Sequence, residues 1–171
     1  MVDGVSGRRL DDEFVSKVTR DLDRWKGYPQ TVCLIIGTNN LRKVREKDKK
    51  KGLEQETPEQ VFERYKKILD HSRKIERSHV VCISMIPDGL QDNLYKEPFH
   101  KLSQMIRKYI RHDRKRWSYL NVASFLTKEG AIKIRYYKIN NIHLQTHGTA
   151  LLINKLFHIL RRGIPNTSFM D

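Results

Sequence analysis

Three short segments of the chain carry groups that are typical of acyl-transfer chemistry. Asn39 lies in the sequence GTNN, directly after the apolar run VCLII, and an amide at the end of a buried strand needs hydrogen-bond partners. His143 precedes a helical pattern near the end of the sequence, and Gly7 lies just before the first helical pattern. An Asn side chain and a Gly backbone N–H can stabilise a tetrahedral oxyanion, while an imidazole can act as general base. The three groups would support acyl transfer if the fold brings them together, but no nucleophile accompanies them.

The elements that must position these groups alternate between helical and strand patterns. Such alternation predicts a parallel sheet between layers of helices, and ligands bind such sheets at the carboxyl ends of the strands. Asn39 is placed at one such end. Thr57, Pro58 and Gln60 predict a helix start with a capping box. We expect helices over 9–26, from 57 onward, over 99–110 and over 151–160, fully buried strands at 31–37 and 79–87, a shorter strand at 119–125, and a strand or extended loop at 131–137.

Length and composition indicate one globular domain that spans residues 1–171. Apolar residues make up 38% of the chain and charged residues 32%, which is the balance expected of a soluble globular protein with a highly charged surface. No apolar run approaches the roughly 20 residues of a membrane span, and the polar start lacks a signal-peptide core. An intracellular, cytoplasmic protein is expected. Cys33 and Cys82 lie in two apolar runs that predict neighbouring strands, so we expect both to pack as small apolar side chains.

The formal net charge of +14 favours polyanionic partners such as nucleic acid or an acidic membrane surface. Basic side chains gather in a polar loop, 42–56, which we expect to be mobile, and in a second cluster that also contains Tyr109 and Trp117. The two aromatic rings suit either base stacking or core packing. The candidate polyanion-binding residues are Arg42, Lys43, Arg45, Lys49, Lys50 and Lys51 in the loop, and Arg111, Arg114, Lys115 and Arg116 in the second cluster.

Three motifs resemble sequence blocks of the SGNH (GDSL-type) hydrolase superfamily. VSGRRLDD, LIIGTNN and IHL occur in the order and spacing of the second, third and fifth blocks. The resemblance implies a three-layer α/β/α sandwich of flavodoxin-like topology. It matches Gly7 and Asn39 to the oxyanion donors and His143 to the general base. A small ester would be the substrate, and neither a cofactor nor a metal is implied.

Two departures from the family pattern bear on activity. The block that ends in Gly-Asp-Ser, with its strand and nucleophile, has no counterpart, so the first strand of the sheet is expected to be missing. The family usually has an Asp three residues before the histidine, where this chain has Asn140. An amide cannot stabilise an imidazolium by charge, and the analogous change in serine proteases costs about 10⁴ in rate.

Three functional hypotheses follow from these observations. The first is an SGNH-type esterase that is weak or inactive as this chain. The second is a catalytically dead domain of the same fold, a pseudoenzyme, that binds RNA or DNA through its basic surface. The third is a plain interaction domain. The sequence leaves the substrate and the oligomeric state open.

Overall fold

A computed structural model describes residues 8–42, 49–50, 52–87, 93–129, 131–139 and 143–163. In order, the larger elements are α1 (Asp12–Arg24), β1 (Gln30–Leu34), α2 (Thr38–Leu41), α4 (Pro58–Arg73), β2 (Ser78–Ile83), α5 (Asn93–Ile110), β3 (Trp117–Leu120) and α7 (Thr146–Gly163). Shorter elements are the 3-10 turns η1 (Arg111–Asp113) and η2 (Ile134–Tyr136), the helix α6 (Ala123–Leu126), and the strands β4 (Thr127–Lys128) and β5 (Ala131–Ile132).

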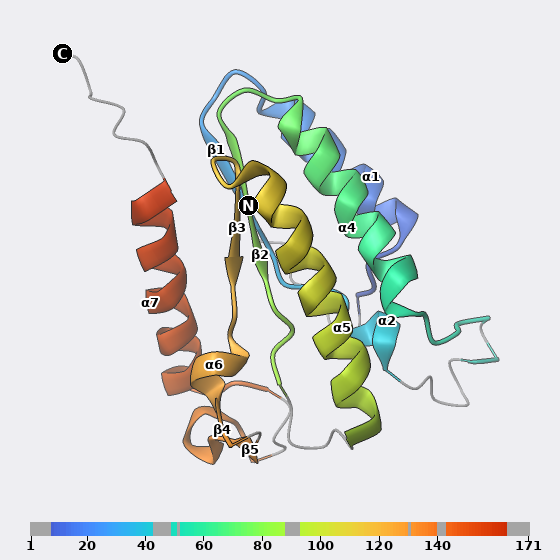
Figure 1. Cartoon of the computed structure of the whole chain (residues 1–171), viewed down its shortest axis with the longest axis vertical. Helices are drawn as coiled ribbons and strands as arrows, with labels where there is room; N and C mark the ends of the chain where they lie inside the picture. Colours follow the sequence, from blue (N-terminus) through green and yellow to red (C-terminus); the bar gives the residue numbers. More distant parts are fainter. Residues whose placement is uncertain are drawn as a thin grey trace.

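The main sheet has the order β1-β2-β3, and both pairings are parallel. Val32 lies opposite Val80, and Val80 lies opposite Trp117. Helices α1, α4 and α5 lie on one side of the sheet and α7 lies on the other (Figure 1). The predicted α/β/α arrangement with a parallel sheet is therefore confirmed, with β1 and β3 as the two edges of the three described strands.

The two faces of the sheet bury separate cores because side chains alternate along each strand. On one face, Val80 and Cys82 pack with side chains of α1, α4 and α5, such as Tyr65 and Leu102. On the other face, side chains of β2 and β3 pack with α6 and α7. They include Val81, Ile83, Leu120, Leu126 and Leu152.

Local signals explain where the first two long helices begin. The Asp11 carboxylate accepts a hydrogen bond from the Phe14 N–H at 2.8 Å and caps α1. At α4, the Thr57 hydroxyl accepts from the Gln60 N–H at 3.3 Å, and the Gln60 side chain accepts from the Thr57 N–H at 2.8 Å. The capping box predicted from the sequence is confirmed, with Pro58 in the first turn.

The prediction that the first strand is fully buried is wrong. Thr31 and Cys33 are exposed in β1, and Ile35 just beyond it is 46% exposed. Helix α7 lies against β3, and the described residues do not extend the second layer as far as β1. Cys33 is therefore not packed as predicted, whereas Cys82 is buried, and both thiols are free. The register still places the two cysteines on neighbouring strands, with Leu34 opposite Cys82.

Other element boundaries also differ from the sequence prediction. The strand expected at 119–125 is the end of β3 followed, after a short connection, by α6, and the segment 131–137 is a two-residue strand followed by a 3-10 turn. The last helix begins at Thr146, before its apolar pattern starts. None of the helices in the described parts of the chain combines the length and hydrophobicity that a membrane span needs.

Candidate functional site

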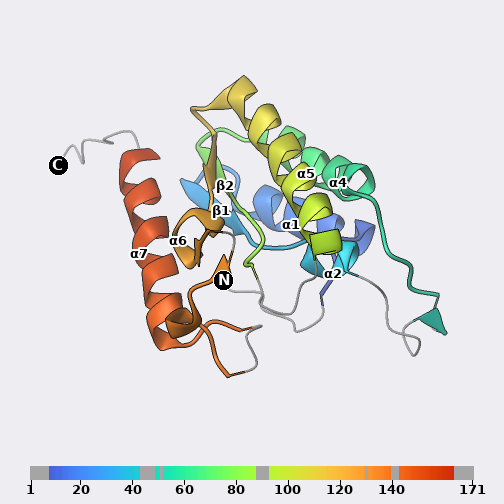
Figure 2. The same cartoon turned by 60° about the horizontal axis from the view of Figure 1, so that its bottom comes forward.

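The candidate site residues of the described chain lie at one end of the sheet. The three parallel strands run toward the lower end of Figure 1, where α2, α6 and the start of α7 are found. Figure 2 is turned so that this end comes forward. Asn39 lies in α2, shortly after β1, and His143 lies three residues before α7. Both therefore occupy the carboxyl-end edge of the sheet, where ligands of parallel α/β proteins bind.

Asn39 is held beside the segment that follows Gly7. Its Nδ2 donates a hydrogen bond to the Arg8 carbonyl at 3.0 Å, which leaves its second N–H without a partner among the described residues. Gly37, with φ of 115°, provides the left-handed turn by which the chain leaves β1 and enters α2. Gly7 itself lies outside the described residues. The structure thus places Asn39, one predicted oxyanion donor, next to Arg8, which directly follows Gly7, the other predicted donor.

His143 is exposed in a loop whose backbone is fixed at several points. The His143 carbonyl accepts a hydrogen bond from the Lys138 N–H at 2.8 Å, and the Gln145 N–H donates to the Tyr136 carbonyl at 2.9 Å. Gly148, in the first turn of α7, permits this packing because a Cβ there would collide with the Tyr136 carbonyl. Asn140 lies outside the described residues. That Asn39 and His143 meet around one acyl group stays a prediction.

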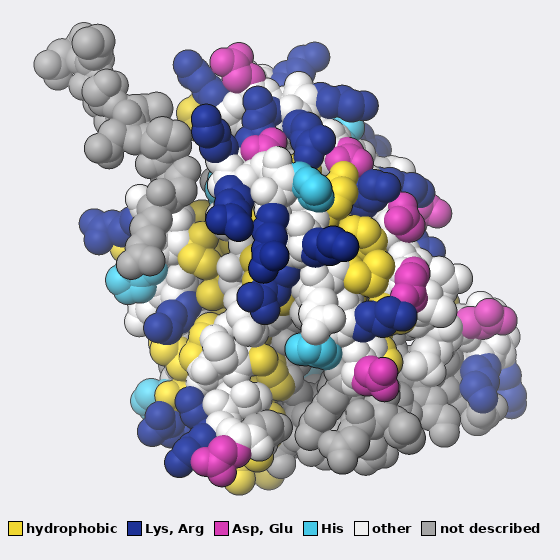
Figure 3. All heavy atoms as spheres, viewed as in Figure 1, with side chains coloured by type: hydrophobic (Ala, Val, Ile, Leu, Met, Phe, Trp, Pro, Cys, Tyr) yellow, Lys and Arg dark blue, Asp and Glu magenta, His cyan; other side chains and the backbone are white. Residues whose placement is uncertain are grey.

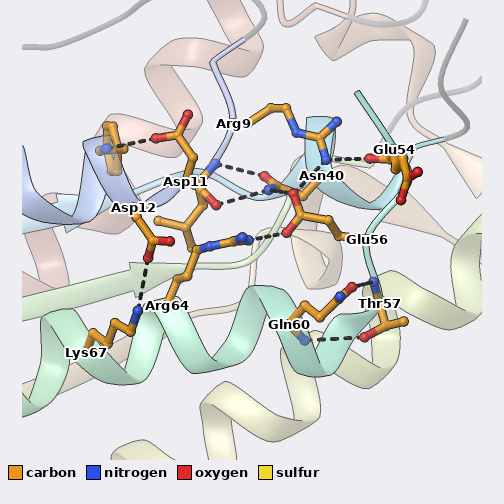
Figure 4. Close-up of polar contacts among 12 residues, drawn as sticks. Arg9, Asp11, Asp12, Asn40, Glu54, Glu56, Thr57, Gln60, Arg64 and Lys67 are labelled. Carbon is orange, nitrogen blue, oxygen red and sulfur yellow. Dashed lines mark hydrogen bonds and ion pairs between the residues drawn. The ribbon is translucent and has the colours of Figure 1, made fainter. Parts of the chain in front are cut away.

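A buried polar network supports Asn39, and its centre is the neighbouring Asn40 (Figure 4). Asn40 is fully buried. Its Oδ1 accepts from the Leu10 N–H at 2.8 Å, and its Nδ2 donates to the Leu10 carbonyl at 3.0 Å and to Glu56 Oε1 at 2.9 Å. The second amide of GTNN therefore binds the backbone of the segment that leads into α1. It serves the fold, and it fixes the strand end on which Asn39 lies.

Glu56 completes the network and was missed by the sequence analysis. It accepts hydrogen bonds from Arg9 at 2.6 Å and from Arg64 of α4. Burial alone would raise the pKa of the Glu56 carboxyl, but the hydrogen bonds from Arg9, Arg64 and Asn40 outweigh burial and hold this pKa below its usual value. The ionised carboxylate thus ties together three segments that are distant in the sequence. Only the Asn of GTNN, whose amide needs buried partners, signalled such a network.

The basic residues predicted to bind polyanions differ in how accessible they are. In the loop, Arg42 is half-buried, and burial lowers the pKa of its guanidinium, while Lys49 and Lys50 are exposed. Lys43, Arg45 and Lys51 lie outside the described residues, which omit 43–48 and 51 of the predicted mobile stretch. The prediction of a mobile, polyanion-binding loop is therefore not tested.

The second cluster presents several cations at the end of α5. Arg111, Arg114 and Lys115 are exposed, and they make no ion pair with the described part of the chain. Arg116 instead donates to the backbone carbonyls of Arg73 and Ile75, so it helps to hold the fold. Figure 3 shows Lys and Arg side chains gathered across the middle of the face that carries α5.

Trp117 of this cluster is only 1% exposed, so it cannot stack on a base while the domain is folded. Its ring stacks on Tyr109, with centroids 5.5 Å apart, and its Nε1 donates to the Ser72 hydroxyl at 3.1 Å. Of the two alternatives left open by the sequence, core packing is correct for Trp117.

Comparison with solved structures identifies the fold. The chain superimposes on a GDSL-like lipase from Bacteroides thetaiotaomicron VPI-5482 with a TM-score of 0.72 and 14% identity, covering 95% of this chain and 75% of the lipase. A carbohydrate esterase of family 3 from Talaromyces cellulolyticus gives a TM-score of 0.61 and 13% identity, with coverage of 93% and 69%. An acetyl esterase mutant with an acetate ion gives 0.62 and 13%, with coverage of 94% and 70%.

The protein therefore has an SGNH (GDSL-type) hydrolase-like fold, as the motifs predicted. No protein-family model matches the sequence, and no curated protein matches it at the sequence level. At these identities the structural likeness establishes the fold and leaves the activity to be tested.

Proposed function

We propose that this domain is built for acyl ester hydrolysis, with Asn39 as oxyanion donor and His143 as general base, and that the 171-residue chain is at most a weak esterase. The observation that carries the proposal is the position of Asn39. A side-chain N–H without a described partner lies at the carboxyl end of β1, next to the Arg8 backbone, in a fold shared with lipases and esterases.

The proposed reaction uses water because no serine of this chain matches the missing Gly-Asp-Ser block. His143 would take a proton as the water oxygen bonds to the ester carbonyl carbon. The Asn39 N–H, together with the Gly7 backbone N–H, would stabilise the resulting oxyanion. Collapse of the tetrahedral intermediate breaks the bond to the alkoxide, which takes the proton from the imidazolium. Asn140 would orient the imidazole without the charge of a carboxylate. Slow turnover follows because the chain lacks the serine nucleophile and because Asn140 carries no charge.

Hydrolysis of p-nitrophenyl acetate tests the proposal. We expect the rate of the wild-type chain to exceed the buffer rate, and His143→Ala to return it to background. Asn39→Ala should do the same, because removal of one oxyanion donor costs about 10²–10³ in established enzymes. His158→Ala, which removes an exposed imidazole from α7, is the matched control and should keep the wild-type rate. Equal rates in the His143 and His158 variants would overturn the assignment.

A second candidate function, RNA or DNA binding by a catalytically dead domain, rests on the cations at the end of α5. Arg111, Arg114 and Lys115 are exposed with no described ion pair, in a chain of net charge +14. Phosphate contacts by such side chains release counterions and make the affinity depend strongly on salt. A cytoplasmic, intracellular location belongs to this proposal.

The salt dependence of binding separates this function from non-specific attraction to the whole surface. We expect the plot of log affinity against log salt concentration for a single-stranded RNA to become shallower by about 2–3 when Arg111, Arg114 and Lys115 are changed to Gln together. A control triple of exposed residues, Lys128, Arg135 and Lys138 to Gln, removes the same charge at the opposite end of the sheet. Equal slopes in the two triples would contradict a defined interface at α5.

A further inference from the structure

The outer edge of β1 lacks the features that usually protect an exposed strand. β1 pairs only with β2 in the described structure, so about half of its backbone N–H and C=O groups point away from the sheet. Natural edge strands are commonly protected by charged side chains, proline or a bulge. Residues 30–36, QTVCLII, contain neither charge nor proline. Among the described residues no other strand pairs with this edge, so it is open there to pairing with an added strand.

A groove of about 830 Å³ runs along this edge. Its wall is formed by mostly apolar side chains of α1 and its C-terminal end, and its floor by both faces of residues 30–39. Trp25 and Ile35 are accessible in the groove, at 49% and 46% exposed, whereas Phe14 and Leu22 are buried behind them. The apolar wall residues are Phe14, Val18 and Leu22 of α1 and Trp25 at its end, and the charged Lys17 and Asp21 of α1 also line the groove.

The chemistry of the groove favours one extended strand over other occupants. An acyl chain would cover the outward N–H and C=O groups of β1 without hydrogen-bonding to them, which is costly. If a second copy of the chain paired through its β1 about a twofold axis, its α1 would lie on the same face of the joined sheet as the α1 of the first copy. The α1 of the first copy already forms the wall of the groove on that face, so the two helices would compete for the same space. A lone strand satisfies the backbone groups and fits beneath α1.

Arg8 adds a polar requirement at the Asn39 end of the groove. Its Nη2 lies 3.5 Å from Glu13, and its guanidinium lies over the Phe14 ring, but its buried Nε–H has no described partner. An occupant that presents a carboxylate there would supply the missing acceptor with a complementary charge.

We propose that the β1 edge binds one extended strand of a partner polypeptide, apolar at alternate positions and uncharged along the groove, with a carboxylate at the end that faces Arg8. The added strand would extend the main sheet beyond β1, in the manner of β-strand addition at an exposed edge.

A synthetic peptide of ten alternating Val and Thr residues, with one Glu at each end, is the probe. At saturation we expect the outward-facing backbone amides of β1, which do not bond to β2, to exchange with deuterium about tenfold more slowly. A peptide of equal length with two internal prolines in place of Thr cannot pair and should give no protection. Equal protection by the two peptides would overturn the proposal. So would outward-facing β1 amides that are already protected in the free protein, or a dimer in analytical ultracentrifugation that dissociates as the peptide binds.

Two variants locate the binding. Val18→Trp fills the groove from α1 and should abolish peptide protection, whereas Ser16→Trp adds the same side chain to an exposed position outside the groove and should leave it unchanged. If Val18→Trp does not fold, Arg8→Gln provides the test. Arg8→Gln should weaken binding of the peptide about threefold. When the terminal Glu residues of the peptide are also changed to Gln, the total loss of affinity should be no larger than this. Binding that survives Val18→Trp, or that Arg8→Gln leaves unchanged, would contradict this site.

Discussion

Asn40→Ala is expected to lower the free energy of unfolding by about 3–5 kcal/mol, a large share of the stability of a single domain. The substitution removes three hydrogen bonds made by one fully buried side chain. It leaves the Leu10 N–H and carbonyl unpaired in the interior, where each unsatisfied group costs about 1–3 kcal/mol. It also deprives the Glu56 carboxylate of a donor. Urea denaturation followed by circular dichroism measures the change.

The neighbouring amide provides the control for this prediction. Asn39→Ala removes one hydrogen bond from a half-buried side chain and should cost only about 1 kcal/mol, although it is the variant expected to lose esterase activity. The two asparagines of GTNN would thus have separate roles, because stability would depend on Asn40 and esterase activity on Asn39. Similar small losses of stability in both variants would show that the buried network does not hold the chain as described.

Asn40→Asp shows why an amide, and not a carboxylate, occupies this position. A carboxylate can still accept from the Leu10 N–H, but it cannot donate to the Leu10 carbonyl, and it would lie against the Glu56 carboxylate. We expect a loss near neutral pH similar to that of the alanine variant. Part of the loss should be recovered as the pH falls and the new carboxyl is protonated.

Features encoded by neighbours in the sequence were predictable. The capping box at Thr57 and Gln60 depends on residues three apart, and both of its hydrogen bonds are present. The alternation of helical and strand patterns led to the parallel sheet, because parallel strands need a crossover between them. The order of the elements was also enough to place Asn39 and His143 at the same edge of that sheet.

Features that depend on the distant parts of the fold were not predictable. The run TVCLII shows no apolar–polar alternation, which is typical of a strand covered on both faces. In the described structure its outer face is open, because burial depends on which element packs there and not on the strand's own residues. Glu56 lies in a polar stretch, and its partners Arg9 and Arg64 lie 47 and 8 residues away. No local pattern specifies such a contact.

Trp117 is the residue for which the sequence left two opposite roles, and its replacement by alanine separates them. We expect Trp117→Ala to cost about 3–5 kcal/mol of unfolding free energy, since a large ring that is only 1% exposed leaves a cavity. The substitution also removes the stacking on Tyr109, the hydrogen bond to the Ser72 hydroxyl, and the contact with the Arg73 guanidinium 4.6 Å from the ring centroid. Urea denaturation monitored by far-ultraviolet circular dichroism measures the loss.

Two further variants distinguish core packing from nucleic-acid stacking. Trp25→Ala removes the same side chain from a site that is 49% exposed and should change stability by about 0.5 kcal/mol. Trp117→Phe keeps an aromatic ring in the core, so it should retain most of the stability and leave RNA affinity unchanged at fixed salt. If Trp117→Phe weakened RNA binding while the unfolding free energy stayed at its wild-type value, the ring would have to leave the core to reach a base. The buried position of Trp117 would then describe only the unbound state.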